Sequence, residues 1–184
     1  VYNDKTYPTS IFIVGMPRSG TTLVESIVSL NEAVQDLGET NIFEKAYQES
    51  LKNHHQHSLT DLYFKKIKEL GFNSVITSNK WLYNYIYAGI IANQISNSKI
   101  IHCFRNPLDN ILSITRANFS TGNSYSSSLE DCAKVYINQD KVMNIYKDQF
   151  SSSIYDLDYD LLVTNPEKTI KSLIKWLGWK WHEN

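Results

Sequence analysis

Cysteine is scarce and long apolar runs are missing from this chain of 184 residues. Two cysteines, Cys103 and Cys132, are too few for a disulfide framework or a cysteine-based zinc site, and they favour a reducing compartment. No apolar run approaches the roughly 20 residues that cross a bilayer, and no secretory leader is evident. Cytoplasmic localisation is therefore the expectation, although the chain begins at Val1 and an N-terminal segment could precede it.

The sequence has no large excess of positive or negative charge. It also has no recognisable metal-binding motif among its histidines. The formal net charge of −1 gives no overall attraction to nucleic acid or to an anionic membrane, so any anion site must be local. His54, His55 and His57 are close in sequence, but no matching ligand group accompanies them. We therefore expect a polar loop or helix end there, and no bound metal.

Arginine is rare, with three residues against fifteen lysines. The three are Arg18, Arg105 and Arg116. Because lysine is the default surface cation of this chain, arginine is expected where a planar, two-point grip on an anion is needed.

One glycine-bounded segment has a clear chemical meaning. Residues 15–22 read Gly-Met-Pro-Arg-Ser-Gly-Thr-Thr and lie between the apolar run 11–14 and the periodic segment 23–28. Such a strand–loop–helix unit turns backbone N–H groups inward, and the helix N-terminus adds roughly half a positive charge, which favours phosphate or sulfate. The spacing nearly matches the ATP-binding pattern G-x-x-x-x-G-K-[ST], but Thr21 replaces the lysine, so ordinary ATP hydrolysis is not expected.

Arg18 would supply the missing cation from inside this loop. The alternative is a strand-to-helix turn that uses glycine for geometry alone. We favour anion binding because the strand, the helix, the arginine and the Thr-Thr pair occur together.

The remaining apolar runs predict the fold. Residues 74–78 lead into Asn79-Lys80, residues 99–104 lead into Arg105, and residues 154–157 form a further candidate strand. Helical patterns separate them, which favours a single α/β domain over 1–184, with a mostly parallel sheet between two helical layers as in P-loop proteins. Ligands of such folds lie at the carboxyl ends of the strands, so the loop, Lys80 and Arg105 should converge.

Three helices are indicated in the second half of the chain. Asn106-Pro107 is a typical start, and the helix that follows would have one apolar face and one polar face. The apolar face holds Leu108, Ile111, Leu112 and Thr115, and the polar face holds Asn106, Asn110, Ser113 and Arg116. We expect Arg105 and Ser113 to border a polar groove, although such a face could simply meet water. Further helices are expected from 129 to 150 and from Asn165-Pro166 to a stop at Gly178.

Several motifs in this order resemble one enzyme family. They are Val14 to Leu23, Gly38-Glu39-Thr40, Asn79-Lys80, Arg105-Asn106-Pro107 with Ser113, Asp158 to Leu162, and Trp176-Leu177-Gly178. Together they resemble the sulfotransferases that use 3′-phosphoadenosine 5′-phosphosulfate (PAPS), above all the tyrosylprotein and tetratricopeptide-linked types.

The resemblance implies a cofactor, PAPS, with 3′,5′-bisphosphoadenosine (PAP) as product and without a metal. The implied cofactor-binding residues are Arg18, Ser19, Gly20, Thr21 and Thr22 for the 5′-phosphosulfate, Arg105 and Ser113 for the 3′-phosphate, and Tyr159 near the adenine. Glu39 falls at the position of the catalytic base, and Lys80 at that of a lysine that assists the leaving group together with Arg18.

These residue types suit the implied chemistry. A carboxylate such as Glu39 can accept the proton of an attacking hydroxyl, while Lys80 and Arg18 can stabilise charge on the departing oxygen. Each role has an alternative. Glu39 precedes Asn41 and could be a carboxylate favoured by a helix dipole; Lys80 could be a surface lysine; Tyr159 could belong to the core.

Departures from the family narrow the expectation. The phenol and steroid enzymes carry a loop lysine and a histidine base, so Arg18 and Glu39 disfavour those substrates. Asn41 stands where the tyrosylprotein enzymes carry an arginine, which disfavours peptide tyrosine. The basic loop that would cover the nucleotide is not found after Trp181. The acceptor hydroxyl, whether of a carbohydrate, lipid, peptide or small molecule, is left open.

Two other functions compete with sulfuryl transfer. A P-loop small-molecule kinase would need a loop lysine and a magnesium-binding acid at a strand end, where Arg105 stands instead. A catalytically silent nucleotide-binding module would bind the nucleotide without turnover. The oligomeric state is not assigned.

Overall fold

The computed structural model describes residues 7–54, 57–117, 119 and 122–181. Its centre is a five-stranded sheet in the order β2-β3-β1-β4-β5, and all neighbouring strands run parallel. The strands are β1 Thr9–Gly15, β2 Val34–Asp36, β3 Ile76–Asn79, β4 Ser98–Phe104 and β5 Ile154–Asp158. This confirms the α/β class and the parallel sheet. The short strand β2 was not predicted, because its three residues form no apolar run.

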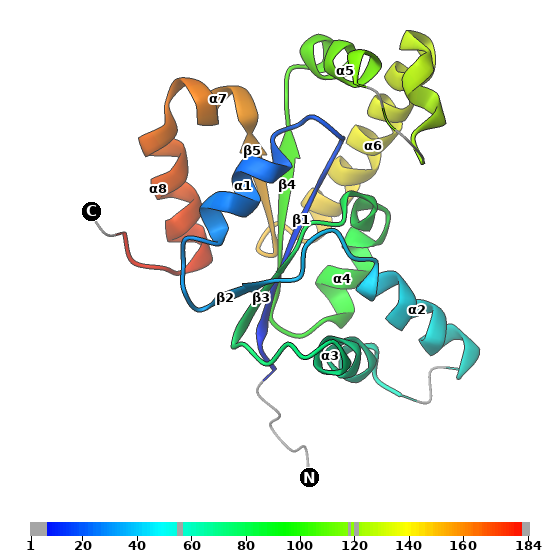
Figure 1. Cartoon of the computed structure of the whole chain (residues 1–184), viewed down its shortest axis with the longest axis vertical. Helices are drawn as coiled ribbons and strands as arrows, with labels where there is room; N and C mark the ends of the chain where they lie inside the picture. The colour runs from blue at the N-terminus through cyan, green and yellow to red at the C-terminus, as the bar shows by residue number, and fades with distance from the viewer. Residues whose placement is uncertain (1–6, 55–56, 118, 120–121, 182–184) are drawn as a thin grey trace.

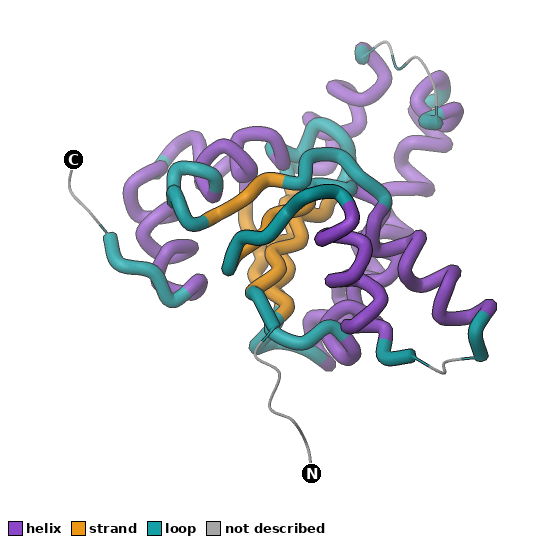
Figure 2. Tube along the Cα trace, turned by 60° about the horizontal axis from the view of Figure 1, so that its bottom comes forward, coloured by secondary structure: helices purple, strands orange, loops and turns teal. Residues whose placement is uncertain are grey.

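Helices cover both faces of the sheet (Figures 1 and 2). The α-helices are α1 Thr21–Val28, α2 Ile42–Lys52, α3 Leu59–Glu69, α4 Ala88–Gln94, α5 Pro107–Arg116, α6 Leu129–Gln149, α7 Tyr159–Thr164 and α8 Pro166–Leu177; the 3₁₀ turns are η1 Leu82–Tyr87 and η2 Ser124–Ser127. Helices α1, α7 and α8 share a core with one face, and α2, α3, α4 and α6 share a core with the other. No helix of the described residues is long and apolar enough to cross a membrane.

The central strand β1 shows why the sheet is buried on both sides. Phe12 and Val14 belong to the core cluster under α2, α3, α4 and α6, whereas Ile11 and Ile13 belong to the cluster under α1, α7 and α8. Alternate side chains of a strand point to opposite faces, so a continuous apolar run is what a strand in the middle of three layers requires.

The carboxyl ends of the strands collect the predicted site residues at one edge. Strand β1 runs into the glycine-bounded loop, Lys80 follows β3, Arg105 follows β4 and Tyr159 follows β5. The expected convergence is therefore confirmed as an arrangement of the backbone.

Helix α5 begins as predicted but buries a different face. The Asn106 side chain caps it by accepting hydrogen bonds from the N–H groups of Leu108 and Asp109, and Pro107 is its first residue. However, Leu108 is 78% exposed, whereas Asn110 is fully buried. Asn110 Nδ2 donates to the Pro17 carbonyl oxygen at 3.0 Å. The helix therefore packs against α6 and the loop: fully buried Ile114 clusters with Met16 and Cys132, and Asn110 makes the polar contact with the loop.

Candidate functional site

The glycine-bounded loop is held in shape by close contacts at its two glycines. A Cβ on Gly15 would lie 2.3 Å from the Cys103 carbonyl oxygen, and one on Gly20 would lie 2.1 Å from the Tyr159 ring. Gly20 also has φ 92°, a conformation that side-chain-bearing residues rarely adopt. Arg18 adopts φ 66°, which is uncommon for a residue with a side chain. The two strands and Tyr159 thus fix the path of the loop.

Ser19 and the start of α1 define what the loop offers to an anion. The Ser19 hydroxyl is buried and donates to the Met16 carbonyl oxygen at 2.7 Å, so this side chain holds the loop together. The first intrahelical bond runs from Val24 N to Gly20 O at 3.1 Å. The N–H groups of residues 20–23 therefore have no intrahelical acceptor, and they lie at the positive end of the helix.

All three arginines of the chain line one cavity beside this loop. The cavity has a volume of about 330 Å³ and is called here the arginine pocket; its lining residues are Arg18, Arg105, Asp109, Leu112, Ser113, Arg116 and Ala117. Arg18 Nε donates to Ser113 Oγ at 3.2 Å, which joins the loop to α5. Arg116 was not assigned to the site from the sequence, although it lies one turn beyond Ser113 on the polar face.

Arg105 is positioned but not fully paired. Its guanidinium carbon lies 5.1 Å from the centroid of the Tyr159 ring, and its Nε lies 3.9 Å from Asp160 Oδ1. That separation is too long for a hydrogen bond, so the buried Nε–H has no acceptor among the described residues. A buried donor without a partner marks a place where an anionic group would be stabilised.

On the other side of the loop, Lys80 joins two carboxylates. Its Nζ lies 2.5 Å from Glu39 Oε1, 3.4 Å from Glu25 Oε2 and 3.4 Å from Thr22 Oγ1. Burial of Lys80 lowers its pKa, but the two carboxylates outweigh this effect and the pKa of Lys80 is raised. Burial also raises the pKa of Glu25, and the nearby Lys80 opposes this shift. Lys80 is therefore a buried, charged lysine in a site of mixed sign.

Asn79 fixes the turn that carries Glu39. It is buried, and its Nδ2 donates to the carbonyl oxygens of Gly38 at 3.0 Å and Thr40 at 2.9 Å. The neighbouring backbone N–H of Lys80 donates to Gly38 O at 3.2 Å. The Glu39 carboxylate thus pairs with Lys80, and Asn41 forms no side-chain cap on α2.

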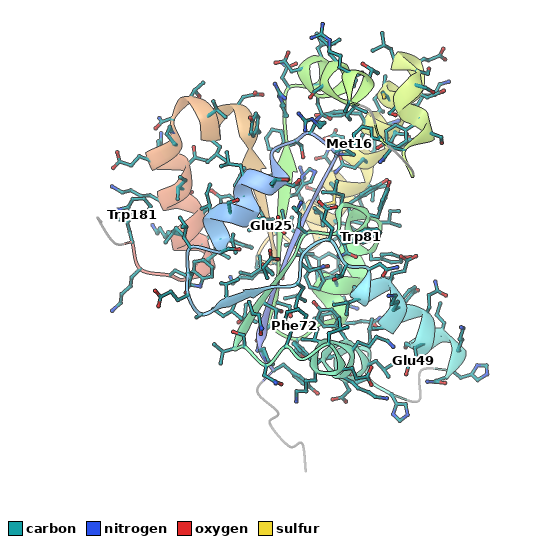
Figure 3. The ribbon with its side chains drawn as sticks, in the orientation of Figure 1. Met16, Glu25, Glu49, Phe72, Trp81 and Trp181 are labelled. Carbon is teal, nitrogen blue, oxygen red and sulfur yellow. The ribbon has the colours of Figure 1, made fainter. Side chains whose placement is uncertain are left out.

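A second cavity opens where Glu39 and Lys80 lie. It has a volume of about 450 Å³ and is called here the aromatic pocket; its lining residues are Pro17, Arg18, Thr21, Thr22, Glu39, Lys80, Trp81, Leu82, Tyr83, Phe119, Gly122 and Asn123. Arg18 lines both this cavity and the arginine pocket. Figure 3 labels Glu25 on α1 and Trp81 on the segment after β3; Lys80, which precedes Trp81 in the chain, pairs with Glu25.

Other features of the described residues lie away from this site. A larger open cavity of about 1150 Å³ is lined by Thr9 and Val75, at the amino ends of β1 and β3, and it contains none of the predicted site residues. Within the described ranges, no three His, Cys, Asp or Glu residues could hold a metal ion. His55 and residues 182–184 lie outside those ranges.

The predicted site residues thus meet around one loop, and comparison with known proteins gives the class. The model of the Sulfotransferase family matches residues 8–58 and 41–183. The chain belongs to this family.

Individual relatives agree with the family and the fold. An uncharacterised protein of Aquifex aeolicus is 28% identical over 94% of this chain, which spans only 26% of that relative. The sulfotransferase domain of the curacin biosynthetic pathway superposes with a TM-score of 0.65 at 16% identity, covering 97% of this chain and 77% of that domain. Mouse sulfotransferase SULT7A1, solved in complex with PAP, gives a TM-score of 0.63 at 15% identity, covering 96% of this chain and 62% of the mouse chain.

Two residues of the site were not found by sequence reasoning. Glu25 follows Thr21 by one helical turn, a spacing that places both on one side of α1. Arg116 follows Ser113 by the same logic on α5. Both residues could have been predicted from their helical spacing to assigned residues, and Arg116 also from the rarity of arginine in the chain.

Proposed function

We propose that this chain transfers a sulfuryl group from PAPS to an acceptor hydroxyl. The observation that carries the proposal is the position of Arg18, which lines the arginine pocket on one side of the loop and the aromatic pocket with Glu39 and Lys80 on the other. A nucleotide with two anionic ends and a separate acceptor requires two such cavities that meet at one cation.

The residues present fit the cofactor. The N–H groups of residues 20–23 with Thr21 and Thr22 would hold the 5′-phosphosulfate. Arg105, Ser113 and Arg116 would hold the 3′-phosphate, for which the unpartnered Nε–H of Arg105 is the specific sign of fit. Tyr159 would lie near the adenine, since its ring already packs on Gly20 and Arg105.

The chemistry is divided between two side chains. When bound, PAPS supplies the sulfuryl group and the leaving group. Glu39 Oε accepts the proton of the acceptor hydroxyl, and its side chain is 64% exposed, so an acceptor can reach it. Lys80, kept protonated by Glu39 and Glu25, places positive charge at Thr22 and the start of α1, where the departing oxygen needs stabilisation.

The carboxylate base and the loop arginine support the tyrosylprotein-like type over the histidine-dependent enzymes. A kinase remains disfavoured, because Thr21 replaces the loop lysine. A silent module would bind PAP and transfer nothing.

Transfer of labelled sulfate tests the proposal. The purified chain is incubated with sulfur-labelled PAPS and a mixed pool of hydroxyl acceptors, without a divalent metal, beside the Lys80→Met variant as a matched control. We expect labelled product from the parent chain and at least tenfold less from the variant. PAP binding without any transfer would identify a silent module instead.

A further inference from the structure

We propose that Lys80 changes partner when the cofactor binds: in the free chain it occupies the Glu39 carboxylate, and the 5′-phosphosulfate attracts it to the start of α1, where Glu25 holds it. Glu39 is then open to the acceptor's proton only after the cofactor has bound, and Glu25 is a positioning residue of the reaction. This proposal rests on the proposed function, because it concerns the order of events at the same site.

The contacts of Lys80 in the free chain are unequal. Its ammonium has three N–H donors, and the acceptors around it are Glu39 Oε1 at 2.5 Å, Glu25 Oε2 at 3.4 Å and Thr22 Oγ1 at 3.4 Å. The first distance is that of a close ion pair, whereas the other two exceed the usual N–H···O range of about 2.7 to 3.2 Å. Lys80 is thus paired with Glu39 and only loosely held by the two groups of α1.

This close pair keeps both side chains away from the reaction. Lys80 Nζ donates to Glu39 Oε1, so this oxygen is not open to the hydroxyl of an acceptor. The same contact holds the ammonium beside Glu39 rather than at the departing oxygen of PAPS, which needs the positive charge. The pair must therefore separate before transfer, and Lys80 then needs another partner.

Burial decides which of the two carboxylates Lys80 keeps. The Lys80 side chain is 6% exposed, Glu25 is 15% exposed and Glu39 is 64% exposed. An ion pair with a well-exposed carboxylate contributes little, because water hydrates the carboxylate when the pair opens. Separation of a buried pair leaves a buried charge without compensation and costs much more. The pair with Glu39 is therefore the one that opens, and PAP affinity is little affected by its loss.

Glu25 has the capacity for a closer contact. This residue comes from the middle of α1 and is labelled in Figure 3. Its Oε1 is buried and accepts no hydrogen bond from the described residues. Burial is the main cause that raises the pKa of Glu25; Lys80 opposes this shift, and the carboxylates of Asp36 and Glu39 add to it. Because a buried acceptor without a donor is costly, an ammonium that moves closer to Glu25 stabilises this carboxylate.

An anion at the start of α1 supplies the attraction for this movement. The N–H groups of residues 20–23 have no intrahelical acceptor, and Thr22, one of these residues, is in contact with Lys80. A phosphosulfate held there lies close to the ammonium, in surroundings less polar than water, where opposite charges attract more strongly. The pKa of Lys80 is raised by the two carboxylates, so its side chain is charged when the anion arrives.

Carbodiimide cross-linking tests the change of partner directly. The reagent activates a carboxylate, a neighbouring amine displaces the resulting urea to form an amide, and mass spectrometry locates the amide. We expect a Glu39–Lys80 cross-link in the free chain and about fivefold less of it, or lower, with saturating PAP or AMP, because both nucleotides carry the 5′-phosphate. Adenosine 3′-phosphate lacks that group and should leave the cross-link unchanged. Glu49 and Lys66, paired at 2.5 Å between α2 and α3, are the internal control and should cross-link equally in all samples.

Glu25→Gln tests the anchor. The amide keeps an oxygen near Lys80 but loses the charge, so Lys80 should stay with Glu39 and the cross-link should persist with PAP. PAP affinity should remain within about threefold of the parent value, whereas transfer of labelled sulfate should fall about tenfold or more because the cation is misplaced. Glu32→Gln changes an exposed glutamate beyond α1 and is the matched control, which should behave like the parent chain.

Calorimetry of each nucleotide separates the two proposals, and the parent-chain result does not depend on the folding of a variant. A Glu39–Lys80 cross-link that is undiminished at saturating PAP would overturn the change of partner. So would an equal loss with adenosine 3′-phosphate, or no such cross-link in a free chain that forms the Glu49–Lys66 one. If PAP does not bind, the proposed function itself fails, and the change of partner fails with it.

Discussion

Lys80 lies between two carboxylates of very different exposure, and this difference separates their roles. The Glu25 side chain is 15% exposed and reaches Lys80 from inside α1, whereas Glu39 is 64% exposed and faces the aromatic pocket. Only Glu39 is open to an acceptor, so Glu39 suits the base and Glu25 suits the positioning of the lysine.

Glu39→Gln should lower sulfate transfer by roughly a hundredfold or more, because the amide cannot accept the acceptor's proton. PAP affinity should change little, since the arginine pocket lies across the loop. Labelled-sulfate kinetics and calorimetry measure the two effects separately. Transfer at the parental rate by the glutamine variant would remove Glu39 from the mechanism.

Arg105→Lys should weaken PAP binding by roughly 1.5 to 3 kcal/mol, because the ammonium keeps the charge but loses the planar fork. AMP lacks the 3′-phosphate, so its binding should hardly change. Arg116→Lys on α5 is the matched comparison at the same pocket. Equal losses for PAP and AMP in calorimetry would show that Arg105 does not contact the 3′-phosphate.

At the scale of elements, the loop between β1 and α1 depends on Gly20, because the Tyr159 ring of α7 fills the space that a side chain would need. Gly20→Ala should destabilise the fold by about 1 to 3 kcal/mol from overpacking against the Tyr159 ring, beyond the backbone strain. Gly38→Ala is the matched control, because Gly38 also has positive φ but no atom within 4 Å of the added Cβ. Thermal unfolding compares them, and equal losses would mean that Tyr159 does not constrain the loop.

A chain of polar contacts joins β4, β5 and α6; His102 and Gln139 are buried, whereas the Asp156 side chain is 39% exposed. His102 Nδ1 lies 2.8 Å from Asp156 Oδ1, His102 Nε2 lies 2.8 Å from Gln139 Nε2, and Lys147 Nζ lies 2.7 Å from Asp156 Oδ2. Gln139 Nε2 can only donate, so His102 accepts there and donates to Asp156. Burial opposes ionisation of Asp156, but the hydrogen bonds from His102 and Lys147 prevail and lower its pKa.

Asp156→Asn should therefore cost about 0.5 to 1.5 kcal/mol of unfolding free energy at neutral pH, because an amide turns a donor toward Lys147 while water screens a carboxylate that is 39% exposed. Because the pKa of Asp156 is lower in the folded protein than in the unfolded chain, where it is near 3.8, ionised Asp156 stabilises the fold at pH values above 3.8. This contribution is lost as the pH falls through the folded-state pKa. Urea unfolding of both proteins should thus show a gap that is constant from pH 5 to about pH 8 and closes below about pH 4. A gap that persists undiminished in acid would contradict the assignment.

Long elements with regular patterns were predictable, and short or polar ones were not. The run 11–14, the Asn106-Pro107 start and the Gly178 stop all match the structure. Helix α7 was not predicted, because six residues give too little periodicity. The buried side of α5 differs from the expected apolar face: its buried residues are Asn110, which bonds to the Pro17 carbonyl, and Ile114, which packs with Met16 and Cys132.

The site was predictable where the topology or the resemblance supplied it. The sheet edge alone brings Lys80 and Arg105 to the loop. The pairing of Glu39 with Lys80 depends on the Asn79 hydrogen bonds across 39 and 41 positions of sequence, which no local pattern contains. The aromatic pocket likewise combines Tyr83 with Phe119, Gly122 and Asn123, and only the tertiary fold joins them.

At the scale of the whole molecule, a nearly neutral protein concentrates its three arginines at one cavity. The net charge of −1 gives no general attraction for anions, so the proposed binding of an anionic cofactor would depend on the arginine pocket and the start of α1. The fold places the arginine pocket and the aromatic pocket on two sides of one loop, and the proposed function assigns the first to the nucleotide and the second to the acceptor. Membership of the sulfotransferase family is consistent with that division of labour.

Calorimetric titration of the chain with PAP, AMP and ATP, with and without magnesium, tests the central claim most directly. The account predicts that PAP binds without magnesium and about tenfold or more tighter than AMP, a difference of about 1.4 kcal/mol or more from the 3′-phosphate. Magnesium should add nothing to PAP binding. Equal affinity for PAP and AMP, or a preference for magnesium-bound ATP, would contradict the assignment of the arginine pocket and with it the proposed sulfuryl transfer.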